Sequence, residues 1–267
     1  MREQLWMLPG ADPAIPLRTT VFKPHDDASP SQPKRPLVII NHGSDEGREA
    51  TAMPVFYWLS RWFVERGYVV ALPQRRGHGA TGGEAMEARD SCSNPDHITA
   101  GKEAADDIEG ALRFMRRQDF IDPARVAVVG VSTGGWGALA LASRNPDGVR
   151  LVVNFAGGRG ARAYGLPNSI CSPDRLIKAA AAFAQTAHVP SLWFYAANDS
   201  YFGPALGASM AAAWNNAGGK ANLKQLKSYG SEGHRIADDR AGWKIWGEPL
   251  YQSLERYMKP NSLAAAK

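Results

Sequence analysis

The chain has 267 residues, of which 44% are hydrophobic and 21% charged, the composition of a globular rather than a disordered protein. The net charge is +5, but the basic residues are scattered and form no cluster of the kind that binds nucleic acid. No apolar run approaches the roughly 18 residues of a membrane span, and the N-terminus MREQLWMLPG lacks the apolar core of a signal peptide. The sequence therefore predicts no nucleic-acid or membrane partner, and either a cytosolic protein or a mature form whose leader was removed.

The first part of the chain predicts a strand, a surface connection and then an alternation of strands and helices. Residues 1–36 hold the N-terminal strand and the Pro-rich connection KPHDDASPSQPKRP. The runs LVIIN (37–41) and YVVALP (68–73) are short and apolar, which is typical of buried strands. Between them, PVFYWLSRWFVERG has apolar residues at helical spacing, with Pro54 in the first turn and Gly67 just past the end.

The same rhythm continues to the C-terminus. A loop over residues 74–98 precedes an amphipathic helix, KEAADDIEGALRFMRRQ, and four further strand–helix pairs follow. A long excursion over 157–188 contains one helix, near 175–186, and the last helix contains Pro249, where a kink or break is expected. Buried strands that alternate with helices predict one α/β domain over 1–267, with a mostly parallel sheet covered by helices on both faces.

The stretch VAVVGVSTGGWGALALAS places one serine, Ser132, where a buried strand turns into a helix. The pattern Gly130-x-Ser132-x-Gly134 in this setting is that of a nucleophile elbow, a sharp turn that leaves no room for flanking side chains. The following helix directs its N-terminal N–H groups and the positive end of its dipole toward the serine. We therefore predict that Ser132 is a nucleophile. The alternative is a Gly-rich turn that packs a helix close to a strand.

A serine nucleophile needs a base held by a third group, and on such sheets the acid and then the histidine follow the serine in the chain. Asp199 ends the strand SLWFYAAND, and His234 follows the next strand, in YGSEGHR. Both lie at the carboxyl ends of predicted parallel strands, where such sheets bind ligands. The alternatives are a helix N-cap for Asp199 and an exposed loop histidine for His234. Five other histidines lack this order or context: His25, His42, His78, His97 and His188.

The tetrahedral intermediate of acyl transfer needs two backbone hydrogen-bond donors. One is predicted to be the N–H of Thr133, directly after the nucleophile. The other is predicted to be the N–H of Ser44, in the NHGSD loop after strand 37–41, where Gly43 lets the backbone approach closely. The alternative is that NHGS forms an ordinary turn.

These motifs resemble the α/β-hydrolase superfamily and, within it, the dienelactone-hydrolase-like and prolyl-oligopeptidase-like esterases. NHGS, DPARVAVVGVSTGG, YAAND and SEGH carry the resemblance, which covers the chain from about Leu37 onward. It implies an α/β-hydrolase fold with small rim or lid insertions, and a serine esterase. Dienelactone hydrolases proper have a cysteine where this chain has Ser132, and oligopeptidases carry a large propeller domain that the residues before Leu37 are too few to form. Dienelactone hydrolysis and a peptidase gated by a propeller are therefore not expected.

The predicted reaction is hydrolysis of a small-molecule or polymeric carboxylic ester through an acyl-enzyme that water releases. The alternatives are a peptidase or amidase with the same triad, and a non-catalytic binding protein that retains the fold. No metal or organic cofactor is expected, because the sequence has no metal-ligand cluster, dinucleotide fingerprint or phosphate loop. Acyl size, ester against amide preference and oligomeric state depend on loop geometry and surfaces, so the sequence predicts none of them.

Two long segments, 74–98 and 157–188, follow strands on either side of the nucleophile strand and are predicted to frame the site. Each contains one of the two cysteines, Cys92 in DSCSNPD and Cys171 in NSICSPD. These are either two free thiols or one disulfide that pins the two rims together. A disulfide would indicate an exported or periplasmic protein, as relatives of the resembled kind often are, and free thiols a cytoplasmic one.

Four residues are candidates for substrate binding. Arg159 follows the strand RLVVNFAGG and would bind a substrate carboxylate. Trp136 lies one turn behind Ser132, and Tyr201 and Phe202 follow the predicted acid, so that they would line an aromatic or acyl pocket. The alternatives are a surface role for the arginine and core packing for the aromatic residues, which is favoured for Trp136.

Overall fold

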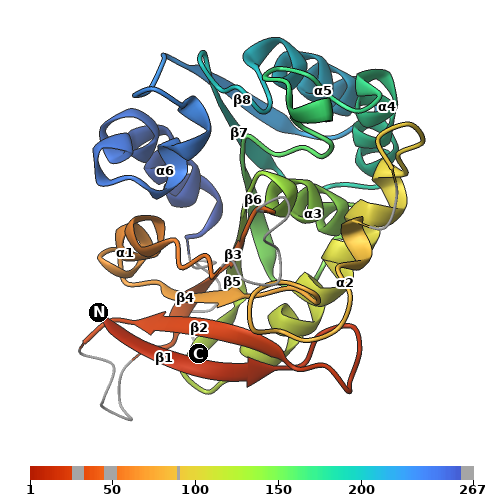
Figure 1. Cartoon of the computed structure of the whole chain (residues 1–267). Coiled ribbons are helices and arrows are strands. Elements are labelled where there is room, and N and C mark those ends of the chain that lie inside the picture. Colours follow the sequence, from red (N-terminus) through yellow and green to blue (C-terminus); the bar gives the residue numbers. More distant parts are fainter. Residues whose placement is uncertain (26–32, 45–52, 89–90, 260–267) are drawn as a thin grey trace.

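The computed structural model describes residues 1–25, 33–44, 53–88 and 91–259 of the chain (Figure 1). Eight strands form one sheet in the order β1-β2-β4-β3-β5-β6-β7-β8. The first two strands are antiparallel to their neighbours and the others are parallel, which confirms the predicted mostly parallel sheet. The strands are β1 (Arg2–Leu8), β2 (Leu17–Lys23), β3 (Arg35–Asn41), β4 (Val69–Pro73), β5 (Ile121–Val131), β6 (Val149–Phe155), β7 (Ser191–Ala196) and β8 (Ala221–Leu226).

Helices cover both faces of this sheet (Figure 1). One face carries α1 (Tyr57–Val64) and α6 (Trp243–Tyr257), and the other carries α2 (His97–Met115), α3 (Thr133–Ala142), α4 (Pro173–Ala184) and α5 (Pro204–Asn216). Short 3₁₀ helices complete the described elements: η1 (Met86–Ala88), η2 (Ala163–Gly165), η3 (Gly233–Asp238) and η4 (Arg240–Gly242).

The central strands carry continuous apolar runs because each one contributes to two cores. In β3, Leu37 and Ile39 pack against the α2–α5 side, whereas Val38 and Ile40 pack against the α1 and α6 side. All four side chains are fully buried. Since side chains alternate between the two faces of a strand, a sheet covered on both faces requires continuous apolar runs. The polar residues therefore begin where these strands end.

Three predicted elements differ from the structure. The N-terminal region forms two antiparallel strands, β1 and β2, rather than one, and part of its Pro-rich connection lies outside the described residues. Helix α1 begins at Tyr57 rather than near Pro54, because Phe56 has a left-handed backbone (φ 45°). Pro249 lies inside α6, which runs unbroken. The buried Trp246 and Leu250 hold that helix on the sheet and offset the lost N–H, which costs about 3 kcal/mol.

The excursion over 157–188 divides into a rim segment and a packed helix. Helix α4 packs beside α3 and α5 in the helical layer, with Leu176, Ala180 and Phe183 buried, and so is no lid. The remaining part, residues 157–172, lies at the carboxyl end of the sheet, where Asn168 N–H donates to the carbonyl of Ser200 after β7 (2.8 Å). The predicted rim or lid is therefore confined to this first half.

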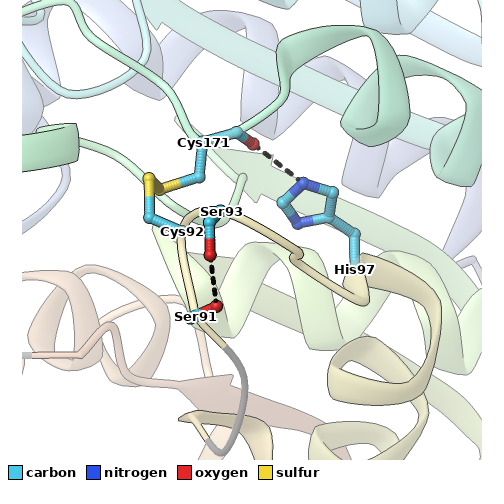
Figure 2. Close-up of a disulfide and its surroundings, with 5 residues drawn as sticks. All are labelled: Ser91, Cys92, Ser93, His97 and Cys171. Carbon is cyan, nitrogen blue, oxygen red and sulfur yellow. Dashed lines mark hydrogen bonds between the residues drawn. A yellow bond between two sulfur atoms is a disulfide. The ribbon is translucent and has the colours of Figure 1, made fainter.

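A disulfide joins the two rim segments (Figure 2). Cys92 and Cys171 are bonded through their sulfur atoms, with their Cα atoms 4.9 Å apart. His97 Nε2 donates to the Cys171 carbonyl (3.0 Å), and the His97 carbonyl accepts from Trp136 Nε1 (2.8 Å). Because Trp136 belongs to α3, the rims are tied to the helix that follows Ser132.

We expect unreduced, denatured protein to contain no free thiol, and reduced protein to contain two. The disulfide closes a loop with a sequence separation of 79. Its loss in a Cys92→Ser/Cys171→Ser variant should lower the free energy of unfolding by about 2–4 kcal/mol, because the unfolded chain gains freedom. Thiol titration and urea denaturation measure the two effects, with Ser91→Ala as a control in the same loop. Two thiols in the unreduced sample would contradict the pairing.

Candidate functional site

Ser132 lies in a strained turn between β5 and α3. Its backbone has φ 57° and ψ −126°, a conformation that non-glycine residues rarely adopt and that costs about 1–3 kcal/mol. The flanking glycines are required by contact, since a Cβ on Gly130 would lie 2.2 Å from the Gly134 carbonyl oxygen, and one on Gly134 would lie 2.2 Å from that of Asn41. The turn is thus built around small residues, as the elbow pattern predicts, and Thr133 begins the helix.

His234 and Asp199 are joined by a hydrogen bond. His234 Nδ1 donates to Asp199 Oδ2 at 2.9 Å, and the Asp199 side chain is completely buried. The other carboxylate oxygen, Oδ1, accepts from the backbone N–H groups of Tyr201 (2.8 Å) and Phe202 (2.9 Å). With its proton held on Nδ1, a neutral His234 imidazole leaves Nε2 free to accept a proton. Helix α5 has Gly203 rather than Asp199 as its N-cap.

Gly158 and Phe202 fill the space between the ends of β5 and β7. The Gly158 N–H donates to the Ser132 carbonyl (3.2 Å), and a Cβ on Gly158 would lie 2.5 Å from the Phe202 ring. The centroid of that ring is 5.9 Å from that of His234. The structure thus places the three predicted triad residues at one edge of the sheet, after the carboxyl ends of β5, β7 and β8, where parallel strands place their ligands.

The two predicted oxyanion donors lie beside the serine. A Cβ on Gly43 would be 2.9 Å from Ser132 Cβ, so the loop after β3 passes directly over the nucleophile. The hydroxyl groups of Ser44 and Thr133 are hydrogen-bonded at 2.9 Å. The two residues predicted to supply the donors, Ser44 from the β3 loop and Thr133 from the N-terminus of α3, therefore lie next to Ser132.

His42 fixes the peptide that carries one of these donors. The backbone N–H of Arg75 donates to His42 Nε2 (3.1 Å), so the imidazole proton lies on Nδ1, which donates to the Gly43 carbonyl (2.7 Å). Burial, followed by the charges of Arg75 and His78, lowers the pKa of His42 well below its usual value. The Gly43 C=O and the Ser44 N–H belong to one planar peptide and point in opposite directions. A neutral His42 therefore sets the direction of the Ser44 N–H.

A buried ion pair supports the same loop. Arg75 binds both carboxylate oxygens of Glu87 at 2.7 Å and donates to the His42 carbonyl at 2.8 Å. Burial opposes the charge on Glu87, but Arg75 and then His78 hold the pKa of this carboxyl well below its usual range. In the sequence, Arg75 is one of the scattered basic residues and was given no role of its own. Its position two residues after the buried strand β4 was the available signal.

The four substrate-binding candidates have different positions. The candidate role of Trp136 in substrate binding is wrong, because its side chain is 1% exposed, packs on Phe183 and does not face the site. The same role is wrong for Phe202, since its side chain is 1% exposed and buried beneath His234 rather than lining an open pocket. Both belong to the core because their helix or loop is covered by the α4 and α5 layer.

The other two candidates lie at the rim. Tyr201 is half-buried, and its ring stacks on His234 with the centroids 4.4 Å apart. Arg159 Nε donates to the Glu87 carbonyl at 3.0 Å, which links the two rim segments. Sequence analysis also missed Glu232, two residues before His234, whose Oε1 accepts the backbone N–H of that histidine (3.0 Å).

Two further searches concern the described part of the chain. Among residues 1–25, 33–44, 53–88 and 91–259, no three His, Cys, Asp or Glu side chains gather in a group that would hold a metal ion. Within the same ranges, none of the helices combines the length and apolar character needed to cross a bilayer.

Sequence comparison matches most of this chain to one family. The profile of the prolyl oligopeptidase family matches residues 54–261. The poly(3-hydroxyalkanoate) depolymerase C of Paucimonas lemoignei is 29% identical over 126 residues, which cover 46% of this chain and 28% of that protein. NocK of Nocardia uniformis subsp. tsuyamanensis, described as an esterase, is 31% identical over 145 residues, 52% of this chain and 38% of its own. The chain thus matches less than two fifths of the length of either relative.

Solved structures match over nearly the whole chain. The acylaminoacyl peptidase of Pyrococcus horikoshii has a TM-score of 0.69 at 17% identity, covering 98% of this chain and 42% of that one. The Pyrococcus furiosus esterase Pf2001 has a TM-score of 0.67 at 15% identity, covering 97% of this chain and 93% of that one. At these identities the likeness concerns the fold, and it confirms the predicted α/β-hydrolase fold.

Proposed function

The chain belongs to the prolyl oligopeptidase family, and we propose on this premise that it is a serine hydrolase that cleaves carboxylic esters with Ser132 as its nucleophile. The observation that carries the proposal is one edge of the sheet at which a strained Ser132 lies beside Gly43 while His234 is bonded to a buried Asp199. Each feature has a chemical role in acyl transfer, and together they form one reaction centre.

The proposed reaction proceeds through two proton transfers at His234. Nε2 takes the Ser132 hydroxyl proton as Oγ attacks the ester carbonyl, and Asp199 stabilises the resulting imidazolium. The N–H groups of Ser44 and Thr133 hold the oxyanion of the tetrahedral intermediate. The imidazolium then protonates the leaving alkoxide, and the acyl group remains on Oγ. Water repeats the sequence, returning the acid product and a free serine.

Ester cleavage is favoured by the matched relatives, which include a depolymerase of a polyester and a protein described as an esterase. The same triad cleaves amides, and the family and the acylaminoacyl peptidase neighbour keep a peptidase as the second candidate. The Cys92–Cys171 disulfide supports action in an oxidising compartment.

Acyl-matched alkyl esters and amides of graded chain length test the proposal, together with labelling by a fluorophosphonate probe. We expect ester turnover, modification of Ser132 by the probe, and loss of both in Ser132→Ala. Amide cleavage as fast as ester cleavage would replace the esterase with the peptidase. A wild-type protein that neither turns over esters and amides nor reacts with the probe would overturn the hydrolase and leave a binding protein on this fold.

A further inference from the structure

Glu232 connects the loop of the acid to the loop of the base. It is the residue before η3, and its Oε1 accepts the backbone N–H groups of His234 (3.0 Å) and Ser200 (3.1 Å). Its Oε2 accepts the Ser200 hydroxyl. Because Ser200 follows Asp199 directly, one carboxylate fixes the backbone on both sides of the His234–Asp199 hydrogen bond.

Arg162 reaches the same cluster from the rim segment 157–172. Its Nη2 donates to the Ser200 hydroxyl and lies 3.4 Å from Glu232 Oε2. Its guanidinium carbon is 4.3 Å from the centroid of the Tyr201 ring, the ring that stacks on His234. The negative Glu232 thus contacts the backbone of His234, and the positive Arg162 contacts the ring that stacks on its imidazole. Neither takes the place of Asp199.

These groups are partly withdrawn from water. The exposed fractions of the side chains are 13% for His234, 17% for Glu232 and 34% for Arg162. Burial opposes the charge of Glu232, but the hydrogen bonds from Ser200 and from the His234 N–H hold its pKa below the usual value. Glu232 is therefore ionised at neutral pH. Charges at this depth interact more strongly than they would in free solution.

The other charged groups near His234 either bind it directly or face away from it. Asp199, from the loop after β7, is its direct partner. On η3 itself, Arg235 is exposed, and Asp238 turns toward α1, where it accepts the N–H groups of Trp58 and Leu59. Among the described residues, Glu232 and Arg162 are thus the charged pair that surrounds the histidine beyond Asp199.

We propose that Glu232 and Arg162 are positioning residues that set, by opposing fields, the pH range over which His234 acts as the base. The inference rests on the proposed function, since it assigns a role around the same histidine. The Glu232 carboxylate favours the imidazolium that forms during acyl transfer, and the Arg162 guanidinium disfavours it.

The pH dependence of kcat/KM for a p-nitrophenyl ester tests the proposal with the full chain. In Glu232→Gln, the imidazolium loses a stabilising charge, so His234 stays neutral to lower pH and the acid limb moves down by about 0.5 pH unit. In Arg162→Met, the acid limb moves up by a similar amount. The double variant returns toward the wild-type profile. A purely structural role would give shifts of one sign or none, and that result would overturn the proposal.

Controls separate the possible failures. Arg235→Gln removes a positive charge beside His234 in the sequence but on an exposed side chain, and its profile should match wild type. Fluorophosphonate labelling of Ser132 reports whether each variant keeps an intact site. If wild type shows neither turnover nor labelling, the proposed function fails. If wild type is active and the acid limb of Arg162→Met does not move to higher pH, the inference alone fails. This outcome can be measured even if Glu232→Gln does not fold.

Discussion

Asp199→Asn is expected to lower kcat for ester hydrolysis by about 10⁴-fold with little change in KM. Asp199 Oδ1 accepts two backbone N–H groups, from Tyr201 and Phe202, so an asparagine would place its oxygen there. Its NH₂ group would then face His234 Nδ1, which would accept a hydrogen bond from the carboxamide instead of donating one. The imidazole proton moves to Nε2, and that nitrogen can no longer accept the proton of Ser132.

Steady-state kinetics at saturating ester measure this effect, with thermal unfolding to show that the variant is folded. Asp119→Asn, an exposed substitution of the same kind, is the matched control and should retain wild-type kcat. An Asp199→Asn enzyme within tenfold of wild type would remove Asp199 from the proposed triad. Fluorophosphonate labelling should slow in parallel, because the serine loses its base.

Arg75→Met is expected to lower the free energy of unfolding by about 3–5 kcal/mol, because it leaves the Glu87 carboxylate buried without its main partner. The side chains of Arg75 and Glu87 are 1% and 8% exposed, so water cannot replace the lost contacts. The His42 carbonyl also loses a donor, which loosens the loop that carries Ser44. We therefore expect kcat to fall as well, with a smaller effect on KM.

Urea denaturation at pH 7.5 measures the loss, with the exposed Arg117→Met as control. The pH matters because the folded protein lowers the pKa values of both His42 and Glu87. The unfolded chain then binds these protons more tightly, so stability is full above the ordinary values and falls on acidification, first through His42 below 6.5 and then through Glu87 below 4.5. A double variant, Arg75→Met/Glu87→Leu, should recover much of the loss. If it is no more stable than the single variant, the buried charge is not the cause.

The candidate site was predictable because its signals are local. An elbow needs small residues around Ser132 for steric reasons that act within a few residues, and these can be identified in the printed sequence. Buried parallel strands are predicted by their apolar runs, so Asp199 could be assigned to the end of β7 without a structure. His234 follows the half-exposed β8, and its assignment depended on its order in the chain after the acid. The N-terminal hairpin was missed in part, because β1 is half-exposed and its pairing with β2 depends on a partner farther along the chain.

Only the tertiary structure decided which way side chains face and which partners neutralise their charges. Helix α3 is buried on nearly all sides, so its sequence has no polar face to show that Trp136 points into the core. Nothing in the sequence pairs Arg75 with Glu87, and only the folded loop makes them one buried pair. Glu232 and Arg162, 70 residues apart, meet through Ser200 on a third segment. The candidate reacting groups can be identified from short segments of sequence, whereas their electrostatic surroundings arise from contacts between distant segments.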